Sequence, residues 1–394
     1  MERFDALVVG AGIAGVATAW FLQAEGRRVA LLDSHAPGWG ASGRNPGFLW
    51  LQTKRAGLPL NFALRARTFA EAFAHDRADS SFRASGGLIL YRGAAYEAVA
   101  AAFVADRCAA GLPVTLLDRA EVRALVPEIG PQVSGAVWNP LDAHQDSAAF
   151  VKRLAADFAA GDGRVIAPAE VVALEVSGGR CEGVRLADGS RIAAPLTVLA
   201  NGPGCNALLD PLGLGLPFRL LRFEAAATAP ADFRLGPVLA GQALFRFFTP
   251  PGIDPQSLPR DPLEALAPDL GFTEQLASLP DGSLQFGCAY EVDSSSDRPS
   301  VAGQALACGI LARNLPALAK LPLERVWAGS VMQTADGLPV IEVSAGPEGL
   351  ALNLGHFFGN LAGAYSGKLL ADGLAGRTPD HPLAPFARAR LLPG

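Results

Sequence analysis

The sequence predicts an α/β fold with an α+β second domain, and three observations lead to this prediction. The chain opens with a short apolar run, a glycine turn, a helical stretch and a second apolar run at Val29–Leu32. This order is typical of a parallel sheet covered by helices. Further short apolar runs lie near the middle and the C-terminal end of the chain. With 394 residues, 50% of them hydrophobic, the chain is long enough for two or three domains.

Each element follows from a local pattern, with apolar runs indicating strands and longer amphipathic or small-residue runs indicating helices. The expected strands are Phe4–Val9, Val29–Leu32, Val165–Val176, Gly183–Leu186, Leu196–Leu199, Val340–Ile341 and Leu350–Leu354. The expected helices run from the first glycine turn to about Gln23 and from Leu361 to Leu374. Two further apolar stretches, Leu220–Phe223 and Leu244–Phe248, are also expected to be strands.

The order of these elements predicts a domain in three separate segments. Residues 1–79, 141–212 and 327–394 would form the nucleotide-binding domain, and residues 80–140 and 213–326 would form an inserted domain with an antiparallel sheet. The second insert contains a proline-rich stretch, residues 249–282. We expect that stretch to be ordered, because leucines within it follow helical spacing.

Composition excludes several classes of protein. The net charge is −5, from 33 basic and 38 acidic residues, with no basic block, which argues against a nucleic-acid binder. The five cysteines form no CxxC pair, so we expect no metal site and no disulfide framework. No uncharged run is long enough for a spanning helix, and the N-terminus lacks a basic leader. We expect a cytoplasmic protein, and peripheral membrane association stays open.

A glycine fingerprint follows the first strand. Gly10, Gly12 and Gly15 form the pattern GxGxxG, in which the glycines allow a tight turn, close approach of a pyrophosphate and close helix packing. The free amides at the helix start would bind the pyrophosphate. Asp33 ends the second strand, where an acid accepts hydrogen bonds from ribose hydroxyls. The pattern predicts a Rossmann-type site for an adenine dinucleotide.

At four islands the chain resembles the D-amino-acid oxidase/glycine oxidase superfamily of FAD enzymes. The islands are Val8–Asp33, the small-residue loop Gly40–Phe48, Leu196–Gly204, and Thr334–Ile341 together with Gly355–Gly367. The resemblance implies FAD stretched between the first turn and the last helix. The loop 40–48 contains no histidine or cysteine that could tether the flavin, so we expect non-covalent FAD.

The resemblance also implies which residues contact FAD. In the first turn and the second strand they are Gly10, Gly12, Ile13, Ala14, Gly15, Asp33 and Ser34. In the flavin-facing loop they are Ala41, Ser42, Arg44, Asn45, Pro46, Gly47 and Phe48. Farther along they are Val171 at the adenine, Ala200 and Gly202 beneath the cofactor, and Gly359, Asn360 and Leu361 at the pyrimidine end of the flavin.

The expected substrate site departs from the family. The resemblance implies that the arginine that grips the substrate carboxylate in related amino-acid oxidases falls on Val331. It also implies that the Phe357-Phe358 pair places an apolar residue where glycine oxidases carry another arginine. A larger or more apolar amine is therefore favoured over a small amino acid. The candidate substrate-binding residues are Gln52, Lys54, Arg222, Arg246, Met332, His356 and Phe358. His144 is expected to lie on the surface near a helix start.

The resemblance implies oxidation of a C–N bond, in a D-amino acid, an N-substituted amino acid or a related amine, to an imine by hydride transfer to flavin N5. One alternative is a 2-hydroxy-acid dehydrogenase, which needs a base for the hydroxyl proton. Another is the FAD-holding subunit of a hetero-oligomeric amine or opine dehydrogenase. The proline-rich stretch, residues 249–282, could serve as a lid or as the interface of such a subunit. The electron acceptor stays open between oxygen, a quinone and a carrier protein.

Overall fold

The computed structural model describes residues 3–294 and 296–392, and these form two compact units. Unit 1 is drawn from Met1–Gly43, Ser147–Leu221 and Ser330–Gly394, and unit 2 from Arg44–Asp146 and Arg222–Gly329. Within the described ranges, no helix is long and apolar enough to cross a membrane.

Unit 1 is built on a six-stranded sheet in the order β19-β20-β13-β1-β2-β9. The strands are β1 Ala6–Val9, β2 Val29–Leu32, β9 Arg164–Ile166, β13 Thr197–Leu199, β19 Val340–Glu342 and β20 Leu350–Leu354. All neighbouring pairs are parallel except β19 with β20 at the edge. The central strand β1 is fully buried, as its continuous apolar sequence predicts. The predicted α/β class is confirmed.

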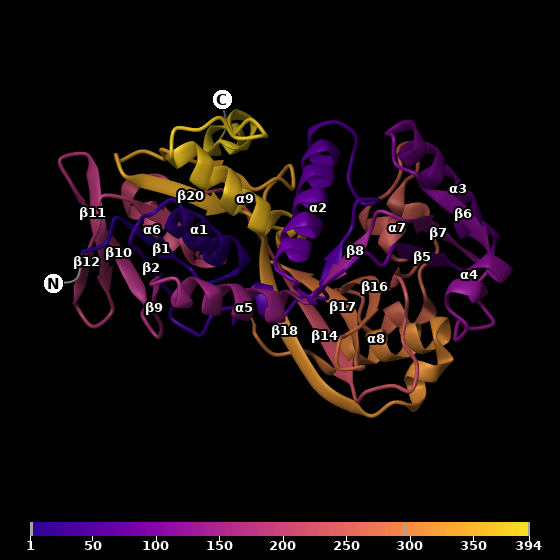
Figure 1. The fold of residues 1–394 in the computed structure, drawn as a ribbon. Coiled ribbons are helices and arrows are strands. Elements are labelled where there is room, and N and C mark those ends of the chain that lie inside the picture. Colours follow the sequence, from indigo (N-terminus) through magenta and orange to yellow (C-terminus); the bar gives the residue numbers. More distant parts are fainter. Residues whose placement is uncertain (1–2, 295, 393–394) are drawn as a thin grey trace. The chain divides into compact units, whose positions relative to one another are not determined.

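Helices cover this sheet. They are α1 Ile13–Ala24, α5 Ser147–Ala160, α6 Cys205–Leu209 and α9 Gly359–Leu374. Figure 1 shows α1 and α9 side by side, and glycines on α9 explain the close approach. A Cβ atom on Gly363 would lie 2.5 Å from Ile13 Cγ2, and one on Gly367 would lie 2.8 Å from Thr18 N. A side chain at either position would push the two helices apart.

A separate antiparallel sheet in unit 1 contains β10 Val171–Ser177, β11 Arg180–Leu186 and β12 Arg191–Ala193. The single strand expected over Val165–Val176 is therefore wrong. Its first part is β9, which pairs with β2 in the large sheet, and its second part is β10, which pairs with β11. Residues 167–170, which include Pro168 and Glu170, separate the two strands, and each strand belongs to a different sheet.

Unit 2 contains most of an eight-stranded sheet in the order β18-β14-β17-β16-β15-β5-β7-β6, of which the first residues of β14 and the last residues of β18 belong to unit 1. The strands are β5 Gly87–Tyr91, β6 Thr115–Asp118, β7 Gly135–Asn139, β14 Arg219–Thr228, β15 Val238–Ala240, β16 Gly271–Ser278, β17 Leu284–Val292 and β18 Leu323–Gln333. The pairs β6–β7, β7–β5, β15–β16 and β16–β17 are antiparallel, whereas β5 and β15 are parallel. The predicted antiparallel sheet is thus largely present.

The helices of unit 2 are α2 Leu58–Asp76, α3 Gly93–Ala109, α4 Arg119–Leu125, α7 Leu244–Phe247 and α8 Val301–Asn314. Local capping explains two of their starts: Asp118 and Glu121 form a capping box at α4, and Ser300 caps α8. The strand expected at Leu244–Phe248 is wrong, because α7 occupies it. The apolar side chains of Leu244 and Phe245 are buried, but they belong to a short helix and not to a strand.

The compact units differ from the expected domains mainly at residues 44–79 and 141–146, which cluster with unit 2. A small antiparallel sheet explains the difference. In it β8 Ala143–Gln145 lies between β3 Phe48–Leu49 and β4 Phe82–Arg83. Backbone pairing thus ties both segments together, and the local sequence does not reveal this pairing.

Candidate functional site

The turn between β1 and α1 in unit 1 has no room for side chains. A Cβ on Gly10, whose φ is +104°, would lie 2.5 Å from Ala200 O, and one on Gly15 would lie 1.8 Å from Gly10 O. Gly12 stands at the N-cap of α1 and offers no side-chain cap to the helix amides. The turn therefore presents backbone amides at the positive end of α1, which suits a phosphate group.

Two polar side chains from separate segments reach this turn. Asp33 Oδ2 accepts a hydrogen bond from Ala11 N at 2.6 Å, and Ser42 Oγ accepts one from Ile13 N at 2.9 Å. Ser42 lies with Ala41 in the 3₁₀ helix η1 Ala41–Gly43. The structure thus brings the end of β2 and the start of the small-residue loop to the glycine turn.

The other predicted residues around Asp33 lie beside it. Ser34 Oγ is 2.9 Å from His35 Nδ1, and His35 N donates to Asp33 Oδ1 at 2.8 Å. The backbone of Asp33 accepts a hydrogen bond from Ala169 N at 2.7 Å, two residues before Val171 at the start of β10. Val171 is therefore brought near the carboxyl end of β2, although ribose binding by Asp33 stays a prediction.

The residues that follow β13 pack against the glycine turn. Ala200 N donates to Val9 O at 2.8 Å, which fixes Ala200 against the end of β1. Gly202 follows with φ +55° and has open space where a Cβ would stand. Parallel strands bring their carboxyl ends to one edge, which is where open α/β sheets bind ligands.

The start of α9 is the second helix terminus of unit 1. Phe358 is its N-cap and gives no side-chain cap, Gly359 is its first residue, and Leu361 is buried. Asn360 Oδ1 accepts a hydrogen bond from Ser147 Oγ at 2.7 Å, which ties this terminus to the start of α5. Its positive dipole end suits a group that gains negative charge.

His356 precedes this terminus and is held by polar neighbours. Its Nε2 lies 2.8 Å from Asn353 Oδ1, and burial lowers the pKa of His356 to about 4. The sequence indicates His356 as a candidate residue but does not indicate Asn353 or its partner Thr18. Both are buried polar residues in otherwise apolar elements, and that contrast was their available signal.

In unit 2 the loop 44–48 is fixed by hydrogen bonds between side chains and backbone groups. Arg44 Nη1 donates to Ala328 O at 3.1 Å, and Asn45 Oδ1 accepts from Gly47 N at 2.7 Å. Gly47 has φ +78°, and a Cβ there would lie 2.4 Å from Gln145 O. Glycine is therefore required at position 47 for β3 to pair with β8.

His144 on β8 packs beside this loop, and its expected surface position is wrong: it is 2% exposed. Because proline has no N–H, the hydrogen bond with the Pro46 backbone runs from the histidine ring to Pro46 O. Burial lowers the pKa of His144 to about 3, although the hydrogen bond to Pro46 acts to raise it. Pairing of Phe48 with His144 draws the ring into the interior of unit 2.

Asp142 holds the next part of the chain and was not among the predicted residues. Its Oδ1 accepts from Leu51 N at 2.7 Å and from Asn139 Nδ2 at 2.8 Å, and its Oδ2 accepts from Gln52 Nε2 at 2.5 Å. Burial raises the pKa of Asp142 to about 7, although these hydrogen bonds favour the ionised form. Gln52 is thus placed by Asp142.

Lys54 lies in the same buried cluster. Its Nζ is enclosed, so contact with a substrate carboxylate would require the loop to open. Burial lowers the pKa of Lys54 well below its ordinary value, and the charge of Asp142 acts in the opposite direction.

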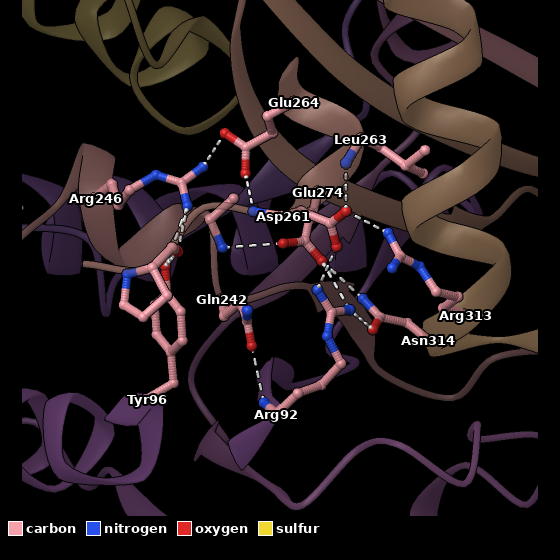
Figure 2. A network of polar contacts seen from close by, with 12 residues as sticks. Arg92, Tyr96, Gln242, Arg246, Asp261, Leu263, Glu264, Glu274, Arg313 and Asn314 are labelled. Carbon is pink, nitrogen blue, oxygen red and sulfur yellow. Dashed lines mark hydrogen bonds and ion pairs between the residues drawn. The ribbon is translucent and has the colours of Figure 1, made fainter. Parts of the chain in front are cut away.

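The two predicted arginines of unit 2 already bind acidic side chains. Arg222 is buried on β14 and donates to Glu224 Oε1 at 2.9 Å and to Ser296 O at 3.0 Å. Arg246 donates to Glu264 Oε2 at 2.6 Å and to the hydroxyl of Tyr96 at 3.1 Å, as Figure 2 shows. These contacts give both arginines a role in the structure of unit 2, so neither is carried into the proposed substrate site.

Met332, another predicted substrate-binding residue, is buried. It is 3% exposed and lies in the apolar core of unit 1. Alternation along β18 places the half-buried neighbours Val331 and Gln333 on the opposite face from Met332.

Comparison with known proteins decides the family. The family described as "FAD dependent oxidoreductase" matches residues 5–373. The chain belongs to this family of FAD-dependent oxidoreductases. It is similar to an opine oxidase subunit of Rhizobium meliloti, with 23% identity over 99% of this chain and 98% of the relative. It is also similar to glycine oxidase of Pseudomonas putida, with 25% identity over 97% of each chain.

Solved structures confirm the fold of this oxidoreductase. Glycine oxidase from Geobacillus kaustophilus superposes with a TM-score of 0.85, covering 100% of both chains at 21% identity. Unit 1 fits the FAD cofactor, because it offers a turn without side chains, a carboxylate at the end of β2 and two helix starts whose N-cap residues give no side-chain cap. FAD would be held at the turn by Gly10, Gly12 and Ser42.

Proposed function

We propose that this oxidoreductase oxidises the C–N bond of an apolar amine, an N-substituted amino acid or a D-amino acid to an imine, which water then hydrolyses. Bound FAD supplies the acceptor for the hydride that leaves the carbon next to nitrogen. The names of its relatives support a C–N substrate, since opines and glycine both contain such a bond.

The observation that carries the apolar preference is the phenylalanine pair at the start of α9. The rings of Phe357 and Phe358 lie 4.7 Å apart at 83°, and both residues are half-buried. The resemblance to glycine oxidases implies an arginine where this phenylalanine pair stands. An apolar edge at this place favours a substrate with an apolar substituent over one held by its carboxylate.

The predicted cations support the same preference. Arg222 and Arg246 are engaged by Glu224 and Glu264, and Lys54 Nζ is enclosed. Binding a substrate carboxylate through any of them would break an existing ion pair or open the loop. Breaking a buried pair costs about 3–5 kcal/mol.

The 2-hydroxy-acid alternative is less well supported, because it needs a base for the hydroxyl proton. In His144 one ring nitrogen is hydrogen-bonded to Pro46 O and Nε2 is enclosed. In His356 the Nε2 atom is bonded to Asn353 and Nδ1 is enclosed. Neither histidine presents a basic nitrogen to a substrate.

A second candidate is that the chain is one subunit of a larger oxidase. The full-length match to a protein named as a subunit of opine oxidase favours it. In that case the isolated chain would retain FAD but turn over slowly until a partner chain is added.

The apolar preference is tested by replacing Phe358 with arginine. In Phe358→Arg we expect the KM for glycine to fall on the order of tenfold, because a charged hydrogen bond contributes about 1.5–3 kcal/mol. The KM for an N-benzyl amino acid should rise. Phe357→Arg is the matched control, and equal effects of both variants on both substrates would contradict the proposal.

A further inference from the structure

A buried chain of hydrogen bonds joins α1 to the turn between β20 and α9. Thr18 Oγ1 donates to Ala14 O at 2.6 Å, and Asn353 Nδ2 donates to Thr18 Oγ1 at 3.0 Å. Asn353 Oδ1 then lies 2.8 Å from His356 Nε2. Thr18 is fully buried and Asn353 is 1% exposed, so these groups have no access to water.

The direction of each hydrogen bond follows from the donors available. A threonine hydroxyl has one hydrogen, and the carbonyl of Ala14 can only accept it. Thr18 Oγ1 therefore accepts from the amide nitrogen of Asn353, which turns the amide oxygen toward His356. Since that oxygen can only accept, His356 carries its proton on Nε2.

Ser366 adds a second acceptor on the same side of the ring. Its hydroxyl donates to Gly363 O at 2.8 Å, so its lone pairs face His356 Nε2 at 3.4 Å. The protons of Thr18 and Ser366 thus end on carbonyl oxygens of α1 and α9. His356 Nδ1 is enclosed and has no hydrogen-bond partner among residues 3–294 and 296–392.

A network that ends on helix carbonyls cannot carry a proton to a substrate. It can, however, fix the distance between two helices. Gly363 and Gly367 of α9 already pack without side chains against Ile13 and Thr18 of α1. The network adds directional contacts to this packing, from Thr18 within α1 to Asn353 and His356 just before α9 and to Ser366 within α9.

We propose that Thr18, Asn353, Ser366 and His356 are positioning residues that hold the start of α9 at a fixed place relative to the start of α1. These helix starts are the two points of unit 1 that suit the pyrophosphate and the flavin of FAD. His356 thus acts on cofactor binding through position and neither binds substrate nor exchanges protons. The inference rests on the FAD dependence of the family and is independent of the proposed substrate.

The first test is FAD binding by threonine variants of the apoprotein, followed by flavin fluorescence. Thr18→Val keeps the shape but removes the hydroxyl, and we expect the Kd for FAD to rise about 3- to 10-fold. Thr18→Ser should restore the Kd. Thr197→Val is the matched control, because Thr197 is also fully buried in unit 1 but its hydroxyl has no partner within the described residues. An equal Kd for Thr18→Val and Thr197→Val would overturn the proposal.

The second test is read from the parent protein, and a variant serves only to assign its signals. Nitrogen NMR of protein with ¹⁵N-labelled histidine reports the tautomer of each ring, and the signals of His356 are assigned with His356→Gln. We expect a neutral His356 with the proton on Nε2, both without and with FAD. A proton on Nδ1 or a charged ring at neutral pH would overturn the proposal, even if FAD binding and substrate oxidation proceed as expected.

Discussion

At the residue scale, Gly12 and Gly15 belong to one glycine pattern, but a side chain would meet different atoms at the two positions. A Cβ on Gly12 would meet Ser42 Oγ at 3.2 Å, a contact that a hydroxyl can relieve. A Cβ on Gly15 would lie 1.8 Å from the carbonyl oxygen of Gly10, which cannot move without opening the turn. Gly12 therefore reserves space for a ligand, whereas Gly15 is needed for folding.

This difference gives a paired prediction. Gly12→Val should purify as a folded protein without flavin, because the side chain takes the place of the pyrophosphate. Gly15→Val should lower the thermal stability of the apoprotein itself. Absorbance at 450 nm and differential scanning calorimetry measure the two effects. A yellow Gly12→Val protein would refute the placement of the cofactor.

His144 gives a prediction about pH. Its pKa is about 3 in the folded protein and 6.5 in the unfolded chain, so the unfolded state binds more protons below pH 6.5. Stability from this group is therefore present above pH 6.5 and is lost as the pH falls. Relative to His144→Asn, the free energy of unfolding of the parent should fall by about 2 kcal/mol between pH 7 and pH 5.

Urea titrations of both proteins at the two pH values measure this difference. The opposite contribution of Asp142, whose raised pKa removes stability as the pH rises toward 7, is present in both proteins and cancels. His75→Asn is the control, because the His75 side chain is 88% exposed. A parent and His144→Asn pair with the same pH slope would contradict the buried neutral state.

Single residues can be predicted from the sequence where the local backbone conformation allows only one residue type, as at Gly10, Gly12 and Gly15. Prediction fails where the constraint comes from a distant segment. Asp142 receives hydrogen bonds from Leu51 and Gln52, which lie far from it in sequence, and nothing in its local pattern indicates them.

At the element scale, the proline-rich stretch is fixed by charges rather than left free. Figure 2 shows Asp261 and Glu264 of this stretch bound to arginines from other elements of unit 2. Asp261 pairs with Arg92 and Arg313, and Glu264 pairs with Arg246. Glu264 also forms a capping box with Asp261 at the 3₁₀ helix η5 Pro262–Leu266. These contacts favour a fixed part of unit 2 over a lid.

The ion pair of Arg246 and Glu264 therefore has a predicted effect on stability. Glu264→Gln should lower the free energy of unfolding by about 3 kcal/mol or more, because it leaves a largely buried guanidinium without its acid. The KM for an amine substrate should stay unchanged. Asp5→Asn, which removes an exposed partner of Arg28, is the control and should have little effect. A changed KM with unchanged stability would return Arg246 to the substrate site.

Elements with strong local signals are those that the sequence predicts well. The limits expected for β2 and β20 agree with the structure, because each is a short apolar run in a buried sheet. The segment of α7 has the same apolar character but folds as a helix. Periodicity alone does not separate a buried strand from a short buried helix.

At the scale of the whole molecule, motifs spread along the chain identified the family and the cofactor, and the match over residues 5–373 confirms both. The composition of the two units was harder to predict. The segment 44–79 follows the dinucleotide turn directly in sequence, yet pairing through β8 places it in unit 2. When distant segments pair through their backbones, the local sequence of neither segment indicates the pairing.

If the chain is one subunit of a larger oxidase, the isolated chain should hold FAD but oxidise amines slowly. Its slow turnover per chain should not depend on the concentration of the chain. Gel filtration with multi-angle light scattering, followed by turnover assays with and without lysate fractions from the source cells, measures this. A lone chain that turns over at its full rate without added fractions would contradict the subunit alternative and leave the C–N oxidase proposal intact.

The most direct measurement is anaerobic bleaching of the bound flavin by a panel of apolar amines, N-substituted amino acids, D-amino acids and 2-hydroxy acids. We expect an amine class to bleach the 450 nm absorbance and 2-hydroxy acids to leave it unchanged. Bleaching by 2-hydroxy acids alone would contradict the proposed oxidation of a C–N bond.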